Sequence, residues 1–170
     1  MKKFELTSEF IDLFGMKLFR IKALIDFGNV RTGDLGGYIE KEDNLSHYGN
    51  AWVSGNAKVY GDANVSGDAN VYGNAKVYGD AWVSGDAWVY GDALIFGNAD
   101  YTTIRGFGSR SRTMTTFFRC KDKTIRVKCG CFYGTIPEFR ERVNKTREGK
   151  IAKEYLMIAD LMEEHFKEEA

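Results

Sequence analysis

The sequence is poor in proline, cysteine and histidine, and each shortage excludes a class of protein. One proline among 170 residues and 44% apolar residues argue against a proline-rich or disordered chain. Three cysteines are too few, and odd in number, for a disulfide framework, which favours a reducing compartment. Two histidines, His47 and His165, cannot supply a three-histidine metal site. The length predicts one domain or a compact pair of domains.

Long apolar runs and a net charge are also missing. No stretch of about 18 apolar residues occurs, so we expect no membrane-spanning segment. Glu5 follows the N-terminus before any apolar run develops, so we expect no signal peptide and a cytoplasmic protein. The 24 basic and 24 acidic residues cancel overall but not locally. Residues 105–128 contain eight basic residues and one acidic residue, whereas residues 49–104 contain two and six.

Nine consecutive six-residue repeats run from Gly49 to Thr102. The first four positions of each repeat are Gly, Asn or Asp, Ala, and any residue. The fifth position is usually Val and the sixth is usually Ser or Tyr. Val alternates with polar or aromatic neighbours, as in a short strand with one side chain inward. The Gly-Asn and Gly-Asp pairs are turn formers. A strand and a corner every six residues predict a triangular parallel β-helix with 18 residues in each coil and coils about 4.8 Å apart.

This period also predicts which side chains stack. Three inward columns should fill the interior: Val53-Val71-Val89, Val59-Val77-Ile95 and Val65-Val83-Tyr101. Burying one valine is worth about 1.5–3 kcal/mol, so the columns could hold the coils together. The residues that flank each Val should point outward on three faces: Trp52, Tyr72, Trp88 and Tyr90; Lys58, Tyr60, Lys76, Tyr78, Leu94 and Phe96; and Asn64, Ser66, Trp82, Ser84 and Asp100. Two aromatic-rich faces are unusual for a monomer in water.

The repeats resemble those of hexapeptide-repeat proteins, which form left-handed parallel β-helices. Residues 18–27 and 33–46, together with Cys129-Gly-Cys-Phe132, resemble the flanking segments of phage- and prophage-encoded proteins that carry such repeats. Ser or Tyr follows the aliphatic residue here, where the family usually has an acidic residue or Gly, so the resemblance is to the fold rather than to a transferase subfamily. It implies a homotrimer assembled through the outward Trp and Tyr faces.

The repeats divide the chain into three parts. Residues 1–48 should form an N-terminal β cap, with two strands within residues 2–27 and a first, degenerate coil within 33–46. Residues 49–104 form the β-helix. Residues 105–170 should form a small α+β unit with a hairpin of strands 115–119 and 124–129. Its first helix should begin at Thr135 with a Glu138 capping box, and its second should run from about 150 to 167. The fold is therefore predicted to be mainly β.

The basic segment is the best candidate for a binding site. Gly-rich turns expose backbone N–H groups and arginine offers paired donors, so residues 106–112 and the following hairpin could bind a phosphate or sulfate. No Gly-Lys-Ser/Thr element is present, so this is not a P-loop. Binding to nucleic acid is less favoured, because the neighbouring repeats and second helix are acidic. The candidate ligand-binding residues are Arg105, Gly108, Ser109, Arg110, Arg112, Arg119, Lys121, Arg126 and Lys128.

Other residues offer alternatives. His47 could be the general base of a hexapeptide-type acyltransferase, although an exposed turn histidine is the simpler interpretation. His165 is more simply a surface residue near the end of an acidic helix. Cys120, Cys129 and Cys131 could form a metal or redox cluster, but the Cys-Gly-Cys spacing and the absence of a nearby histidine favour structural thiols. The C-terminal unit could instead bind a host protein as an inhibitor or structural module.

These patterns together predict a non-enzymatic, oligomeric binding protein for a small anionic, nucleotide-like ligand. No cofactor, metal or membrane partner is expected. The phage resemblance suggests one concrete role, the sequestration of a host immune nucleotide signal in the cytoplasm of an infected cell. An acyltransferase and a host-protein-binding module stay as alternative functions.

Overall fold

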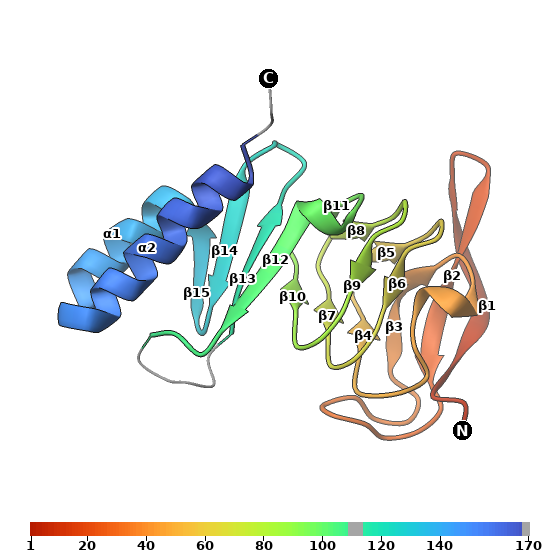
Figure 1. Ribbon diagram of the computed structural model, residues 1–170. Helices are drawn as coiled ribbons and strands as arrows, with labels where there is room; N and C mark the ends of the chain where they lie inside the picture. The colour runs from red at the N-terminus through yellow and green to blue at the C-terminus, as the bar shows by residue number, and fades with distance from the viewer. Residues whose placement is uncertain (109–113, 168–170) are drawn as a thin grey trace. The chain divides into compact units, whose positions relative to one another are not determined.

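The computed structural model describes residues 1–108 and 114–167, and the chain divides into two units, residues 1–98 and 99–170. The first unit is a parallel β-solenoid of about three turns, preceded by antiparallel strands. The second is an antiparallel sheet with two helices. The predicted mainly β fold is confirmed (Figure 1).

An antiparallel hairpin opens the first unit and leads into the solenoid. Strands β1 (Phe4–Leu13) and β2 (Met16–Ala23) form the hairpin, as the alternation of apolar and polar residues predicted. Strand β3 (Leu35–Ile39) pairs antiparallel with β2 on one side and parallel with β5 on the other. The isolated bridge from Leu45 to Val65 is also parallel. The degenerate first coil is therefore confirmed, and η1 (Glu42–Asn44) lies within it.

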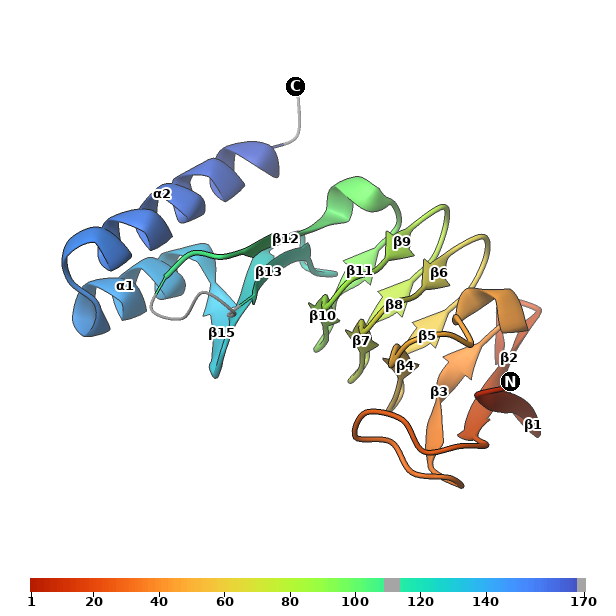
Figure 2. The ribbon, with the colours of Figure 1, turned by 60° about the horizontal axis from the view of Figure 1, so that its bottom comes forward.

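Eight two-residue strands build the solenoid, in the three rows that Figure 2 shows. Except for the last three, each strand pairs in parallel with the strand 18 residues later, as for Val53 and Val71. The corner Ala and the inward Val or Ile of these repeats are at most 1% exposed. At the corners coils approach so closely that a Cβ on Gly67, whose φ is +67°, would lie 3.0 Å from the Gly85 nitrogen. The strands are β4 (Trp52–Val53), β5 (Lys58–Val59), β6 (Asn64–Val65), β7 (Asn70–Val71), β8 (Lys76–Val77), β9 (Trp82–Val83), β10 (Trp88–Val89) and β11 (Leu94–Ile95).

Beside the paired strands, backbone N–H groups of one coil donate to carbonyls of the following coil. The N–H of Trp52 donates to the carbonyl of Ala69, and the N–H of Asn70 donates to that of Ala87. At two corners of the first repeats, carbonyl groups accept from side chains instead of from backbone N–H groups. Lys3 Nζ donates to the carbonyls of Ala51 at 2.8 Å and Gly49 at 3.4 Å.

Asn44 caps the same end of the solenoid at another corner. Its side-chain amide donates to the carbonyls of Gly61 at 3.1 Å and Ala63 at 2.8 Å. Lys3 and Asn44 are at most 1% exposed. Their side chains take the place of backbone N–H donors at these two corners, so both residues close this end of the interior.

The ninth repeat departs from the prediction. Asn98–Asp100 forms the 3₁₀ turn η2, and Tyr101 begins the longer strand β12 (Tyr101–Arg105) of the second unit. Tyr101 pairs with Phe118 and is partly exposed, so it does not extend the Val65-Val83 column. A tyrosine ring is too large for a valine column, and Thr102 to Ile104 are β-branched residues that favour an extended strand.

The second unit is a four-stranded antiparallel sheet with both helices packed on one face (Figure 1). The predicted hairpin strands and the capping box are confirmed: the Thr135 N–H donates to Glu138 Oε2 at 2.7 Å. Phe117 and Val127 from the sheet pack with Phe139 and Met162 from the helices. Its remaining elements are β13 (Met114–Arg119), β14 (Ile125–Cys129), β15 (Phe132–Thr135), α1 (Ile136–Thr146) and α2 (Gly149–His165).

Candidate functional site

Strand register divides the candidate basic residues between the two faces of the sheet. Arg119 lies on the same face as Val127 and Phe117, the face that the helices cover. Its Nε lies 3.2 Å from Asp100 Oδ1, and its Nη2 donates to the Phe166 carbonyl at 3.3 Å. The guanidinium thus holds the end of α2 against the sheet, which is a structural role.

Arg105, Arg126 and Lys128 share the opposite face. Their register partners on β13 are Met114, Phe118 and Thr116, which alternate with the core-facing residues of that strand. Arg126 Nη2 lies 3.1 Å from Asp122 Oδ2, and Lys128 Nζ donates to the Gly130 carbonyl. The register therefore brings three of the nine predicted residues to one sheet face.

The other predicted ligand-binding residues do not join that face. The Gly108 N–H donates to Glu154 Oε2 at 3.2 Å, and a Cβ on Gly108 would lie 1.9 Å from the Tyr155 hydroxyl oxygen. Gly108 is therefore packed against α2, where no larger residue fits. Lys121 is exposed in the β13–β14 turn. Ser109, Arg110 and Arg112 lie outside the described residues.

His47 is engaged in packing the N-terminal cap. Its ring stacks on Phe4 with centroids 4.3 Å apart, and its Nδ1 accepts the Lys3 backbone N–H at 3.2 Å. Its Nε2 lies 3.5 Å from Glu42 Oε2. Hydrogen bonds from Lys2 and then His47 hold the pKa of Glu42 below its usual value. Both ring nitrogens thus have structural partners, which weakens the case for His47 as a general base.

The three cysteines occupy different environments. Cys120 is buried, Cys131 is exposed, and Cys129 is half-buried. Cys129 Sγ accepts the Thr115 hydroxyl at 3.2 Å and lies 3.8 Å from the Tyr155 hydroxyl oxygen. Among the residues that the structure describes, no three His, Cys, Asp or Glu side chains gather as metal ligands would.

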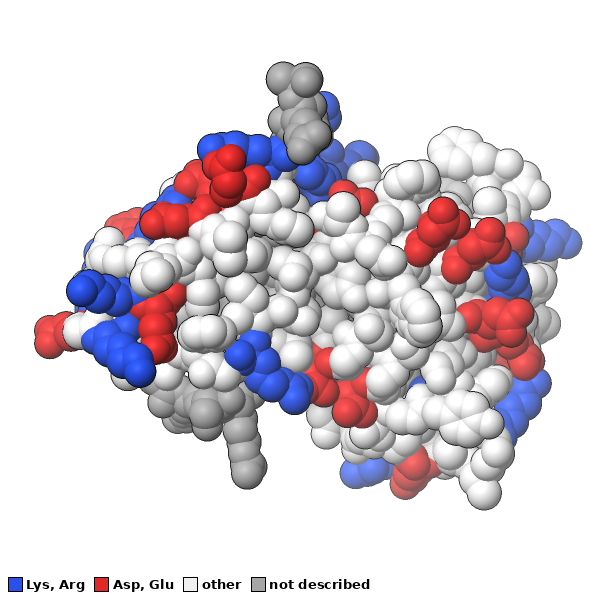
Figure 3. Space-filling model, viewed as in Figure 1, with Lys and Arg blue, Asp and Glu red and all other residues white. Residues whose placement is uncertain are grey.

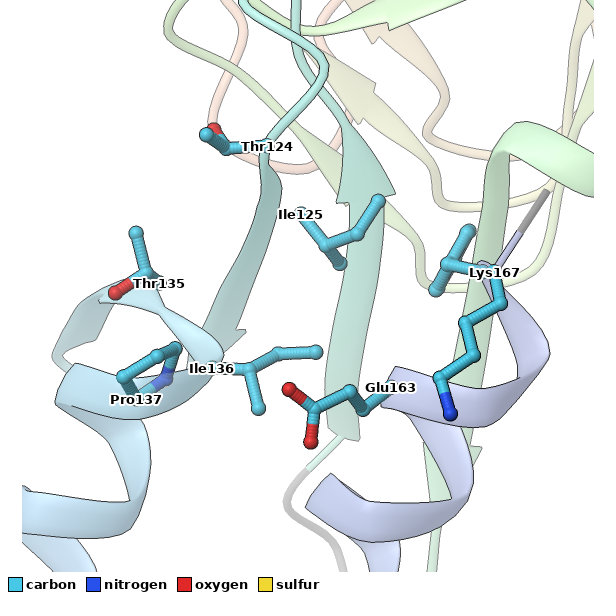
Figure 4. Close-up of a pocket in the computed structure, with 8 residues that line it drawn as sticks. Thr124, Ile125, Thr135, Ile136, Pro137, Glu163 and Lys167 are labelled. Carbon is cyan, nitrogen blue, oxygen red and sulfur yellow. The ribbon is translucent and has the colours of Figure 1, made fainter.

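A groove of about 310 Å³ opens in the second unit, where the start of α1 and the end of α2 meet the sheet (Figure 4). Its walls are mostly apolar. Its two charged groups already have partners, because Glu163 lies 2.7 Å from Arg140 and Lys167 contacts Glu164. The groove therefore offers little to an anion. Its lining residues are Thr124, Ile125, Thr135, Ile136, Pro137, Glu163, Phe166 and Lys167.

Basic side chains do not form one continuous surface over the helices. In the view of Figure 3, acidic and basic groups are interspersed over α1 and α2. Lys145 with Glu141 and Lys150 with Glu154 are two such helix pairs. The outer helix surface in this view is therefore mixed in charge rather than basic.

The outward faces of the solenoid carry the predicted aromatic ladders, with one correction. Tyr60 stacks on Tyr78 with centroids 5.1 Å apart, and Tyr72 stacks on Tyr90 at 4.8 Å. Trp52, which was expected outside, is only 6% exposed. Phe27, from the segment between β2 and β3, lies edge-on to it with centroids 5.4 Å apart.

Comparison with known proteins adds no functional assignment. A scan of protein-family models gives no match to the chain, and a search of curated proteins gives none either. No helix within residues 1–108 or 114–167 is long and apolar enough to cross a membrane.

Proposed function

We propose that the protein is a non-enzymatic binding protein for a small anionic ligand, such as a nucleotide. The observation that carries this proposal is the shared sheet face of Arg105, Arg126 and Lys128. Guanidinium and ammonium groups on one sheet face, here from β12 and β14 on either side of β13, can contact several phosphate oxygens. The adjoining segment 106–113 contributes Arg110 and Arg112, the sequence's further candidates for the same ligand.

The contacts of His47 support a binding role over the acyltransferase alternative, because its Nδ1 and Nε2 face the Lys3 N–H and Glu42. The solenoid then acts as a scaffold, and its outward rings support assembly into an oligomer. Membership of the hexapeptide-repeat proteins, a trimeric state and sequestration of a host immune nucleotide in a phage-infected cell belong to this proposal. These three parts of the proposal rest on the hexapeptide repeats and on the flanking segments that resemble those of phage proteins.

Calorimetric titration with ADP and with inorganic pyrophosphate tests the proposal. We expect saturable binding by the wild type, and at least about tenfold weaker binding by Arg126→Gln/Lys128→Gln and by Arg110→Ala/Arg112→Ala, because each pair removes two charge-assisted contacts. The matched control is Lys150→Gln/Lys153→Gln, which removes the same charge from α2. Absent binding, or equal binding by all variants, refutes the anion site.

A further inference from the structure

The closed end of the β1–β2 hairpin is an exposed apolar tip. In Figure 1 it projects beyond the other elements of the first unit. Phe14, in the turn, is 100% exposed, and Phe10 on β1 is 45% exposed. Leu13 and Met16, the register partners that close the hairpin, are only half-buried. In the view of Figure 3 this end is uncharged, with acidic and basic groups beside it.

The backbone of the turn is unfavourable for a phenylalanine. Phe14 and Gly15 have φ values of 54° and 85°. A two-residue hairpin turn with two positive φ values is the type that prefers Asn-Gly. Within residues 1–108 and 114–167, only Phe14 and Lys123 combine a side chain with a positive φ. A bulky residue is disfavoured in this conformation, and the Phe14 ring gains no burial in return. Folding of the chain therefore does not explain this ring.

The strands below the turn hold the ring in place. Residues 10–13 pair regularly with residues 16–19, and Asp12 Oδ1 accepts the Gly15 N–H at 2.9 Å. Phe10 packs on Phe19 with centroids 6.0 Å apart, and Lys17 Nζ lies 4.5 Å from the centroid of the Phe10 ring. An apolar group on such an ordered ribbon loses little conformational freedom when it binds. The tip is therefore built as an anchor rather than as a loose loop.

The charges of the hairpin indicate what kind of surface the tip fits. Arg20 forms an ion pair with Glu9 at 3.4 Å, and Asp12 is the register partner of Lys17. A lipid anchor needs an excess of basic residues, and burying Asp12 at a bilayer surface would be costly. A protein can instead pair both charges at the rim of a pocket. The hairpin strands carry three acidic and three basic residues: Glu5, Glu9, Asp12, Lys17, Arg20 and Lys22.

We propose that this tip docks into another protein, one that has an apolar pocket for the Phe14 ring. Charged groups at the rim of that pocket pair with Asp12 and Lys17. Leu13 and Met16 surround the ring and exclude water, as apolar residues do around the central residue of an interface. The tip lies in the first unit, so this docking is independent of the anion site and of the oligomer in the proposed function.

Stability measurements on Phe14→Asn test whether the ring serves folding. We expect a higher urea midpoint than that of the wild type, because asparagine tolerates a positive φ and the exposed ring contributes no burial. Gly15→Ala is the matched change in the same turn and should lower the midpoint, because alanine is strained at a positive φ. A lower midpoint for Phe14→Asn would overturn the proposal, since the ring would then stabilise the chain itself.

Photo-crosslinking in cells that carry the gene tests the docking. p-Benzoylphenylalanine in place of Met16 lies beside an intact Phe14, and the same group in place of Lys150 on α2 is the control. We expect a partner protein captured from position 16 only, and not when Phe14→Asn is added. Capture of a second copy of this chain, or no capture that depends on Phe14, refutes the proposal.

Calorimetry with the purified captured protein completes the test. We expect saturable binding by the wild type, at least about tenfold weaker binding by Phe14→Asn, and unchanged binding by Lys150→Gln. Equal binding by Phe14→Asn contradicts the anchor. Sedimentation with vesicles of phosphatidylcholine and phosphatidylglycerol checks the alternative surface, and vesicle binding that is lost in Phe14→Asn would replace the protein pocket by lipid.

Discussion

The first and third coils of the solenoid carry the same residue in different surroundings. Trp52 and Trp88 occupy equivalent positions in one row of strands, two coils apart. Trp52 is 6% exposed and Trp88 is 44% exposed. The difference comes from Phe27, which belongs to a segment outside the repeats. The repeat therefore sets where a side chain points, and non-repeating segments determine whether it is buried.

Alanine substitution at these two tryptophans gives the largest expected contrast. Trp52→Ala should lower the free energy of unfolding by about 3–5 kcal/mol, because it removes a buried ring that Phe27 packs against. Trp88→Ala should cost about 1 kcal/mol or less within one subunit. Urea denaturation followed by circular dichroism measures both, at a concentration where the proteins share one oligomeric state. Equal losses would show that burial does not separate the two positions.

The carbonyl caps of the first coil give the next largest effect. Lys3→Met and Asn44→Ala should each cost about 1–3 kcal/mol, because buried carbonyls lose their donors. Lys2→Met is the control, since Lys2 forms an exposed ion pair with Glu42 and should matter by about 1 kcal/mol or less. Thermal or urea unfolding makes the comparison. A Lys3→Met loss no larger than that of Lys2→Met contradicts the capping role.

The N-terminal cap of α1 can be compared with the caps of the solenoid, because it lies in the second unit and involves no stacked coil. Thr135 accepts the Glu138 N–H, and Glu138 accepts the Thr135 N–H in return. Thr135→Ala should therefore cost about 1 kcal/mol. Amide hydrogen exchange should show the loss in α1, with the solenoid strands of residues 52–95 unchanged. Equal loss of protection in those strands would show that the two units unfold together.

A separate test is the pH dependence that Lys3 causes. Burial lowers the pKa of Lys3 to about 8, although the negative charge of Asp68 acts in the opposite direction. Between about pH 8 and 10.5 the unfolded chain keeps the proton more fully, so the stability of the folded protein rises with pH. The slope from this group is at most about 1.4 kcal/mol per pH unit. Urea unfolding of the wild type and of Lys3→Met at several pH values isolates the contribution of Lys3. If the difference in their free energies of unfolding does not change with pH, the lowered pKa of Lys3 is contradicted.

Sequence periodicity predicts what lies within the repeats. The 18-residue coil follows from the six-residue unit, and it predicts the stacking of Tyr60 on Tyr78 and of Tyr72 on Tyr90. The period does not reveal the burial of Trp52, because its cover comes from a segment without a repeat. The period also does not indicate that Lys3, in a terminus that looks solvated, is buried at the end of the solenoid interior, with only 1% of its surface exposed.

The candidate site was predicted less completely than the fold. A charge count identifies the basic segment but ignores the alternation of strand faces. The predicted strand 124–129 already places Arg126 and Lys128 on one side, since they are two residues apart. Arg119 has two partners that are distant in the sequence. Asp100 lies 19 residues before Arg119 and Phe166 lies 47 residues after it, so no local pattern reveals these contacts.

The 18-residue register between coils makes solenoid length adjustable in fixed steps. The Lys3 and Asn44 caps contact only the first coil, so their contacts do not depend on how many coils follow. Insertion of 18 residues would add a whole coil and keep every column aligned. An insertion of six would rotate all later residues to the next face and set lysines above tryptophans. Evolution or design can therefore lengthen this protein in multiples of 18 without altering either end.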